Sequence, residues 1–332
     1  MPETPHGPPA HDDLQGRPVL VTGGAGFIGS HLVDALVERG ARVRVLDNLA
    51  TGNRANLEHR SGEIELRVAD LRDLDACRRA CEGVEVVFHQ AALGSVPRSM
   101  KDPATTVAVN VGGTANIFTA ARDAGVGRLV YASSSSVYGD SRELPKREGE
   151  EGEVLSPYAA SKAMDEDLAR VFGRAFGLEA VGLRYFNVYG PRQDPAGPYA
   201  AVIPRFFAAA LAGEAMVIHG DGEQSRDFTY VADAVAANLL AAAAPPSTAG
   251  RAYNVAAGGR TTVNELAEAV AEVVRQAGFD VPPPHHVDPR PGDVAHSLAD
   301  LTRSREELGY APSHGLRQGL AEALPHYRSL AG

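Results

Sequence analysis

The sequence predicts an α/β fold in which helices cover both faces of a doubly wound parallel sheet. From residue 17 to about residue 186, short apolar segments alternate with longer stretches of helical periodicity, as in consecutive β–α–β units. The apolar segments are continuously hydrophobic, which is typical of strands buried on both faces. With 332 residues, 44% of them hydrophobic, the chain is long enough for one large domain or two closely packed ones.

The expected elements follow one another in a regular order. Strands are expected at 17–24, 41–47, 64–71, 84–92, 128–134 and 179–189, and helices at 27–40, 73–82, 103–124 and 157–176. Beyond residue 186 the loops lengthen and become rich in Pro and Gly, but a helix at 230–243 and a strand at 252–258 return to the sheet. We expect a disordered lead-in at 1–16. The sheet domain is expected to span 17–186 and to include 229–258. A smaller lobe, interleaved with it, is expected to consist of 187–228 and 259–332.

Composition argues against several classes of partner. The formal net charge of -10 disfavours a nucleic-acid or anionic-membrane surface. No apolar run reaches the roughly 18 residues that a membrane span needs, and the N-terminus lacks the apolar core of a secretory signal. We therefore expect a soluble cytoplasmic protein. Cys77 and Cys81 share one helical face without accompanying histidines, so we interpret them as packing residues and expect no metal site.

The segment between the first expected strand and the first expected helix has the pattern of a dinucleotide-binding turn. Gly23, Gly26 and Gly29 permit a tight turn and a close approach of pyrophosphate to the helix N-terminus, although GxxGxxG is one residue wider than the usual GxGxxG. Asp47, at the end of the second strand, is placed to bind a ribose 2′-hydroxyl and repel a 2′-phosphate, which favours NAD over NADP. Asp70, after the third strand, is a candidate for the adenine amino group or an ordinary strand-end acid.

Tyr158 and Lys162 are four residues apart in SPYAASK, so they share one face of the expected helix. A phenol with an ordinary pKa of about 10 is a poor base at neutral pH, but an ammonium and an oxidised nicotinamide nearby favour the phenolate. The run 133–136, SSSS, ends the fifth strand at the carboxyl edge of the sheet, where doubly wound folds bind ligands. One of these hydroxyls is therefore expected to share a substrate hydroxyl with Tyr158.

Together, TGGAGFIGS, LDNL, HQAA, SSSSVYGD, SPYAASK and RYFNVYGPRQ resemble the extended short-chain dehydrogenase/reductase family, over nearly the whole chain from about residue 17. The resemblance implies a Rossmann-type sheet, NAD as cofactor and a small α/β lobe that binds a nucleotide sugar. It also implies that Tyr158 is the acid/base, Lys162 its partner and Ser134 the triad serine, with Ser135 as a competitor. The residues implied to bind NAD are Gly23, Gly26, Phe27, Ile28, Gly29, Asp47, Asn48, Asp70, Leu71, Ala91, Ala92, Tyr158, Lys162 and Tyr185.

The smaller lobe carries further matches to this family. GDGEQSRDF and RPGD imply that Arg226 and Arg290 hold the diphosphate of a UDP-sugar, a task that suits guanidinium groups. AALGSVPRS and PRQDPAGPYAAVIPRF resemble the UDP-N-acetylglucosamine/UDP-N-acetylgalactosamine 4-epimerases. That resemblance places Ser297 where epimerases restricted to non-acetylated sugars have a tyrosine, so the serine leaves room for an N-acetyl group. The residues implied to surround the sugar and its diphosphate are Gly94, Ser95, Ser135, Asn187, Gln193, Ala201, Arg226, Arg290 and Ser297.

The implied reaction is a transient oxidation at C4 of the sugar. Tyr158 removes the O4 proton as C4 gives hydride to NAD, and the 4-keto sugar then rotates and takes the hydride back on its other face. Because NAD is regenerated, it stays bound between the two half-reactions. The family resemblance also implies a homodimer formed through the helices at 103–124 and 157–176.

Several alternatives are compatible with the same core motifs. One alternative is a 4-epimerase that acts on UDP-glucose. Another is a 4-epimerase that acts on UDP-glucuronate, with Arg98 bound to the carboxylate of the sugar. Family 4,6-dehydratases carry an Asp–Glu pair where this chain has Ser135 and Ser136, which disfavours the common dehydratase reaction. An NAD-sensing protein without catalysis is disfavoured by the intact Tyr158 and Lys162.

Overall fold

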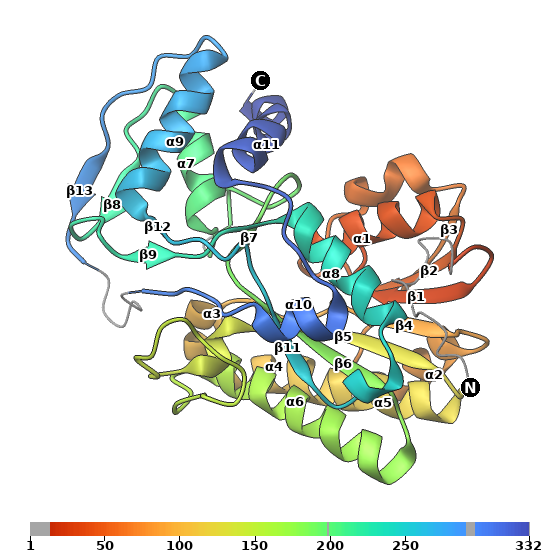
Figure 1. Cartoon of the computed structure of the whole chain (residues 1–332). Helices are drawn as coiled ribbons and strands as arrows, with labels where there is room; N and C mark the ends of the chain where they lie inside the picture. The colour runs from red at the N-terminus through yellow and green to blue at the C-terminus, as the bar shows by residue number, and fades with distance from the viewer. Residues whose placement is uncertain (1–13, 198, 290–295, 332) are drawn as a thin grey trace, which may run out of the picture.

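A seven-stranded sheet in which every pairing is parallel forms the centre of the computed structural model, which describes residues 14–197, 199–289 and 296–331 (Figure 1). The strand order is β3-β2-β1-β4-β5-β6-β11, so the direction of winding reverses between β1 and β4. The predicted α/β doubly wound fold is therefore confirmed, and ligands of such folds bind at the carboxyl ends of these strands. The strands are β1 (Pro18–Thr22), β2 (Arg42–Asp47), β3 (Ile64–Val68), β4 (Val86–His89), β5 (Arg128–Ser134), β6 (Ala180–Tyr185) and β11 (Ala252–Val255).

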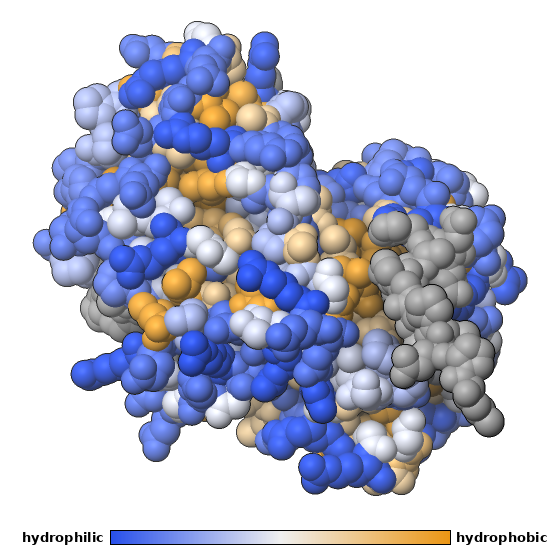
Figure 2. Space-filling view, viewed as in Figure 1, coloured by the Kyte–Doolittle hydropathy of each residue, from blue (hydrophilic) through white to orange (hydrophobic). Residues whose placement is uncertain are grey.

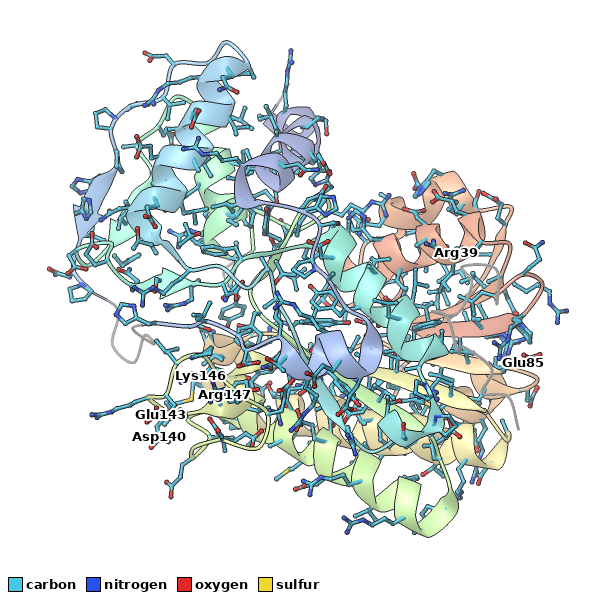
Figure 3. The ribbon with its side chains drawn as sticks, viewed as in Figure 1. Arg39, Glu85, Asp140, Glu143, Lys146 and Arg147 are labelled. Atoms are coloured by element: carbon cyan, nitrogen blue, oxygen red, sulfur yellow. The ribbon has the colours of Figure 1, made fainter. Side chains whose placement is uncertain are left out.

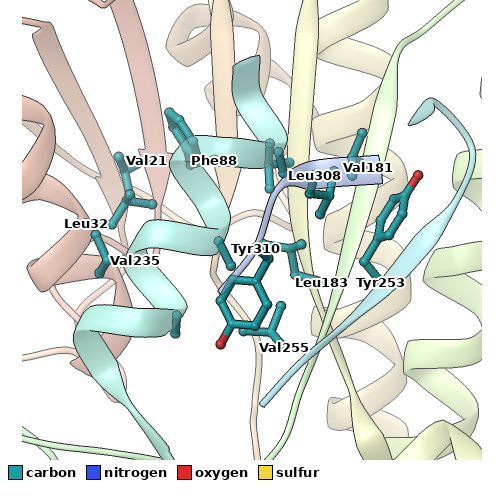
Figure 4. Packing of buried hydrophobic residues seen from close by; sticks show 14 of the residues in the cluster. Val21, Leu32, Phe88, Val181, Leu183, Val235, Tyr253, Val255, Leu308 and Tyr310 are labelled. Atoms are coloured by element: carbon teal, nitrogen blue, oxygen red, sulfur yellow. The ribbon is translucent and has the colours of Figure 1, made fainter. Parts of the chain in front are cut away.

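Helices pack on both faces of this sheet, and each face has its own apolar core. On one face lie α1 (Phe27–Glu38) and α8 (Val231–Ala243), and Figure 4 shows side chains of this core between α8 and the strands. On the other face lie α2 (Leu74–Cys81), α5 (Gly113–Asp123) and α6 (Pro157–Phe176). Cys77 and Cys81 are buried in this second core, and burial raises the pKa of both thiols to about 12, as suits packing residues.

Two expected elements were predicted wrongly in their extent. The strand expected at 179–189 ends with β6, because Asn187 adopts a φ of 36° and turns the chain out of the sheet; β7 (Val188–Tyr189) then pairs with β10 (Thr229–Tyr230). The helix expected at 103–124 is divided into α4 (Pro103–Val107) and α5 by a π-helical turn, η2 (Ala108–Gly112). Both irregularities lie beside the carboxyl edge of the sheet, where they redirect polar side chains.

The smaller lobe has a separate apolar core above the sheet. Its helices pack around buried residues such as Phe206, Phe207 and Leu266, and Figure 1 shows α7, α9 and α11 grouped at one end of the molecule. Figure 2 shows a mostly hydrophilic surface with apolar side chains exposed between this lobe and the rest of the molecule. The remaining elements are η1 (Arg54–Arg60), α3 (Val96–Lys101), η3 (Ser135–Tyr138), α7 (Val202–Leu211), β8 (Val217–His219), β9 (Ser225–Arg226), η4 (Pro246–Thr248), β12 (Thr261–Thr262), α9 (Val263–Gln276), β13 (His285–Val287), α10 (Thr302–Leu308) and α11 (Leu316–Ala331).

None of the helices in the described ranges is long and apolar enough to cross a membrane.

Candidate active site

The turn between β1 and α1 forms an anion-binding cradle. Gly23 has a φ of 68°, and a Cβ on Gly29 would lie 2.1 Å from the Gly23 carbonyl oxygen, so the backbone can turn this tightly only with glycine. Gly26, the N-cap of α1, supplies no side-chain hydrogen bond to the first turn, which leaves backbone N–H groups for an anion. These features fit the pyrophosphate of a dinucleotide.

Two carboxylates stand at the ends of the neighbouring strands. Asp47 is buried and accepts hydrogen bonds from the backbone N–H of Ala25 (3.0 Å) and of Leu49 (2.8 Å), which fix its carboxylate beside the glycine turn. Asp70 accepts from the Arg72 guanidinium (2.8 and 2.9 Å) and from Asn48 Nδ2 (2.9 Å). The Arg72 pair holds the pKa of Asp70 well below its usual range, so this group is a carboxylate at neutral pH.

A continuous cleft of about 1010 Å³ runs from the glycine turn to the smaller lobe and collects most of the predicted site residues. Ser95 does not line this cleft, because its side chain caps α3 by accepting from the Arg98 N–H (3.2 Å). Ala201 lines a second cavity of about 280 Å³, and Arg290 lies outside the described residues. The predicted residues that line the main cleft are Gly23, Gly26, Phe27, Ile28, Gly29, Asp47, Asn48, Asp70, Leu71, Ala91, Ala92, Gly94, Ser134, Ser135, Tyr158, Lys162, Tyr185, Asn187, Gln193, Arg226 and Ser297.

Helix α6 presents the predicted catalytic pair to this cleft. Ser156 caps the helix by accepting from the Ala159 N–H (3.1 Å), and Tyr158 and Lys162 line the cleft one turn apart. The Lys162 side chain is only 3% exposed, and its ammonium donates to the Ala132 carbonyl (2.9 Å) and to Asp165 Oδ2 (3.1 Å). These two hydrogen bonds therefore hold the ammonium of Lys162 next to strand β5.

The four serines at the end of β5 have different surroundings. Ser133 Oγ donates to Glu166 Oε1 at 2.6 Å and is committed to that contact. Ser134 Oγ accepts from the Ser136 N–H (3.1 Å), which leaves its own O–H available to the cleft, and Ser135 also lines the cleft. Ser134 and Ser135 therefore both remain placed for the predicted role of triad serine.

The family model of the NAD dependent epimerase/dehydratase family matches residues 19–256. The UDP-glucose 4-epimerase of Mycolicibacterium smegmatis is 41% identical over 314 residues, which are 93% of this chain and 98% of that protein. The chain belongs to this family. A solved UDP-N-acetylglucosamine 4-epimerase from Methanobrevibacter ruminantium, in complex with UDP-N-acetylmuramic acid, is 39% identical with a TM-score of 0.89, over 95% of this chain and 99% of that one. A dTDP-glucose 4,6-dehydratase from Streptomyces venezuelae, solved with NAD bound, is 33% identical with a TM-score of 0.85, over 94% and 97% of the two chains.

This family is the extended short-chain dehydrogenase/reductase family that the motifs resemble, so that prediction is confirmed. The predictions of an enzyme of the epimerase class and of NAD as cofactor are confirmed with it. The roles assigned to individual residues stay predictions, to which the geometry of the cleft adds support.

Asp227, which motif reasoning did not single out, organises the side of this epimerase/dehydratase-family cleft that the smaller lobe provides. Its carboxylate is fully buried and accepts from the backbone N–H groups of Ala257 (3.0 Å), Gly258 (3.2 Å) and Ala299 (3.3 Å). Burial raises the pKa of Asp227 to about 6, against the opposing effect of these hydrogen bonds. Its position next to Arg226 in the chain is the sequence signal that could have drawn attention to it.

The segment that carries Ser297 is held on two sides. The Ser297 N–H donates to the Ser225 carbonyl (3.0 Å), two residues before Asp227. On the other side, the Lys146 N–H donates to the Leu298 carbonyl (2.7 Å), and the Asp300 N–H donates back to the Lys146 carbonyl (2.9 Å). Figure 3 shows Lys146 and Arg147 together on the loop that makes this contact. Ser297 is thus fixed at the cleft wall by backbone hydrogen bonds.

A second group that motif reasoning missed lies beneath the cofactor side. His89 is buried at the end of β4, between the hydroxyls of Thr22 (2.7 Å) and Thr114 (3.0 Å). Burial, followed by the charge of Lys162, lowers the pKa of His89 to about 3, so the imidazole is neutral. The π-helical turn adds Asn110, whose side chain accepts from the Leu93 N–H (2.8 Å) and donates to the hydroxyl of Ser161 on α6 (3.0 Å). In the sequence, His89 is the first residue of HQAA and Asn110 is the first residue of NVGG, and these two segments could have drawn attention to them.

Proposed function

We propose that the protein is a UDP-N-acetylglucosamine/UDP-N-acetylgalactosamine 4-epimerase that also interconverts UDP-glucose and UDP-galactose. The observation that carries this proposal is that residues with small side chains, Ser297 and Gly94, line the expected sugar end of the cleft. Ser297 lines it beside Asn187 and Arg226, and a Cβ added to Gly94 would meet no atom within 4 Å. This wall leaves volume for a 2-acetamido group, and a smaller unsubstituted hexose fits the same space.

Arg226 supports a binding mode for the nucleotide part of the substrate. It lines both the main cleft and the smaller cavity, which also share Asn187 and Gln193. A diphosphate bound at Arg226 directs the sugar into the main cleft toward Tyr158, and the nucleoside into the smaller cavity, where Phe206 and Phe228 provide apolar walls. Two differently sized spaces joined at one guanidinium suit a nucleoside diphosphate sugar.

The chemistry follows from the residues at the carboxyl edge of the sheet. When bound, NAD supplies the acceptor and then the donor of the C4 hydride. The phenolate of Tyr158 accepts the O4 proton and returns it after the sugar has turned. Ser134 donates a hydrogen bond to O4 of the sugar. Lys162 holds a positive charge under this site. The wide sugar end of the cleft permits the 4-keto sugar to present its other face.

The carboxylates around the cleft favour epimerisation over 4,6-dehydration. Among the described residues that line it, the acids are Asp47 and Asp70 at the cofactor end and Asp194 in the loop after β7. Ser135 and Ser136 occupy the positions next to Ser134, where a dehydratase needs an acid/base pair for C5 and C6. Arg98 does not line the cleft and lies 5.2 Å from the Tyr199 ring, so it offers no carboxylate contact that would favour UDP-glucuronate.

The decisive experiment incubates the purified protein with UDP-N-acetylglucosamine, UDP-glucose or UDP-glucuronate, without added NAD, and resolves the products by NMR. We expect the C4 epimers of the first two sugars and no net oxidation, because NAD copurifies and is regenerated. A deoxy-keto or unsaturated product would replace the proposal with a lyase reaction, and turnover of UDP-glucuronate alone would reassign the sugar.

We also propose that two copies of the chain pair through the outer faces of α4 and α6. Val107 on α4 and Met164, Val171 and Phe176 on α6 are each at least 41% exposed, which is an unusual concentration of apolar side chains on adjacent helices. A Met164→Glu, Val171→Glu double variant is expected to sediment as a monomer at concentrations where the wild-type protein is a dimer. Equal sedimentation of the two proteins would contradict the pairing.

A further inference from the structure

Helix α6 carries a third polar side chain in register with the predicted catalytic pair. Tyr158, Lys162 and Asp165 are spaced i, i+4 and i+7, so they lie along one face of the helix, which turns toward the sheet. The Asp165 side chain is 1% exposed, and its Oδ2 lies 3.1 Å from the Lys162 Nζ. An aspartate this close to the ammonium, with both groups out of water, is an ion pair whose charges are weakly screened.

The other ionisable groups around this pair do not replace Asp165 as the counter-ion. Glu166 on the same helix is taken up by Ser133 (2.6 Å) and by two bonds from Arg184 (2.9 and 2.7 Å) on β6. His89 on β4 is neutral, as its low pKa requires, and burial raises the pKa of Tyr131 on β5 well above its ordinary value, which keeps that phenol neutral. Among the described residues, the ion pair of Lys162 is with Asp165.

The pKa of the Asp165 carboxyl is subject to opposing influences. Burial raises its pKa, and the charge and hydrogen bond of Lys162, together with the Thr114 hydroxyl, oppose that rise. Its second oxygen, Oδ1, is buried without a hydrogen-bond partner within the part of the chain that the structure describes. The carboxylate therefore accepts from the Lys162 ammonium through Oδ2.

Resting on the proposed function, we infer that Asp165 is a positioning residue for proton transfer at C4. It holds the Lys162 ammonium against the Ala132 carbonyl of β5 and partly cancels the positive field that this ammonium exerts on Tyr158. A lone ammonium one turn below a phenol favours the phenolate, whereas an ammonium paired at 3.1 Å acts on it only as a dipole.

The test compares Asp165→Asn with the wild-type holoenzyme. Asparagine has nearly the same shape and an amide oxygen that can still accept from Lys162, but it carries no charge. We expect the acidic limb of the kcat/KM–pH profile to move to lower pH by about one unit, because the ammonium then acts on Tyr158 unopposed. An unchanged limb, or a shift to higher pH, would overturn the inference.

A matched control removes an equal charge from the opposite side of the same helix. Asp167 is exposed and paired with Arg170, so Asp167→Asn is expected to leave the profile where it is in the wild type. A shift in Asp167→Asn as large as that in Asp165→Asn would show a general charge effect and contradict a role specific to Asp165. If Asp165→Asn does not fold, Asp165→Ala removes the same charge and is expected to shift the limb in the same direction.

A second readout needs no sugar and so separates this inference from the proposed function. The phenolate absorbance of the NAD-bound protein is titrated with pH, and the titration of the matching Tyr158→Phe variant is subtracted. The difference is expected to appear at lower pH in Asp165→Asn than in the protein with Asp165. Superimposable difference curves would overturn the inference, whereas absence of epimerase activity would refute the proposed function and leave this measurement valid.

Discussion

The two sides of the cleft are built in different ways. On the cofactor side, the glycine turn, Asp47 and the serines all stand at the ends of long parallel strands, and α6 packs along the same sheet. On the substrate side, Arg226 lies on β9, which has two residues, and Ser297 lies outside the named strands. The sheet fixes the first side through many cooperative hydrogen bonds, whereas the second depends on a few contacts, above all those of Asp227. Changes on the first side should therefore affect the chemical step, and changes on the second should affect selectivity and local stability.

The largest expected effect is on the cofactor side. Tyr158→Phe removes the hydroxyl that exchanges the O4 proton and is expected to lower kcat by roughly 100- to 10,000-fold. Because the ring remains, circular dichroism and the amount of copurified NAD should match those of the wild type. Retention of wild-type turnover would end the assignment of Tyr158 as the acid/base.

Ser297→Tyr tests the substrate side. The ring is expected to fill the space left for the acetamido group and to lower kcat/KM for UDP-N-acetylglucosamine by roughly 10- to 100-fold relative to UDP-glucose. The measurement is the ratio of kcat/KM for the two sugars, with Ser297→Ala as the control that keeps the space open. An equal loss for both sugars would contradict the assignment of this wall to the acetamido group.

Asp227→Asn tests how far the substrate side depends on one carboxylate. The amide can accept through only one oxygen, so some of the N–H groups of Ala257, Gly258 and Ala299 lose their acceptor. At pH 7 we expect a loss of about 1–3 kcal/mol in the free energy of unfolding, measured with urea. Asp280→Asn, at an exposed position of the same lobe, should change it little. Equal free energies of unfolding for the two variants would show that the hydrogen bonds of Asp227 do not stabilise the substrate side of the cleft.

A last comparison separates the two sides by the sign of their response to acid. The neutral, buried His89 contributes stability that is complete above its ordinary pKa of 6.5 and is lost as pH falls through about 3. The raised pKa of Asp227 has the opposite consequence: its contribution is complete below 3.8 and is lost as pH rises through about 6. Each group changes the free energy of unfolding by about 1.4 kcal/mol per pH unit where only one state is protonated.

Asp227→Asn removes one of these opposing contributions. Between pH 6 and 4, its free energy of unfolding is expected to fall more steeply with acid than that of the wild type, whereas His89→Gln is expected to fall less steeply. Urea unfolding at several pH values measures both slopes. Parallel curves for the three proteins would mean that neither group titrates on unfolding in this range.

The same division describes what could be predicted from the sequence. The continuous apolar run of β1 and the spacing of Tyr158 and Lys162 are local patterns, so the sheet, the glycine turn and the position of these two residues one turn apart on a helix were predictable. The end of β6 was not, because Val188 and Tyr189 continue the strand pattern and only the turn at Asn187 interrupts it. The contacts of Asp227 reach 30 and 72 residues along the chain, a separation at which no local pattern operates. On that side, motif resemblance placed the residues, and the structure supplied the reason for their position.

The π-helical turn at Ala108–Gly112 has a consequence for how this site can change. Such a turn holds one residue more than an α-helical turn of the same height, and the extra residue brings Asn110 to Leu93 and Ser161. No substitution can remove an inserted residue, whereas deletion of one residue would rotate one flank of the helix by about 100° relative to the other. Chain length, as well as the identity of Asn110, therefore preserves this part of the site, and loss of the π-helical turn in a related protein should appear as a one-residue gap in a sequence alignment.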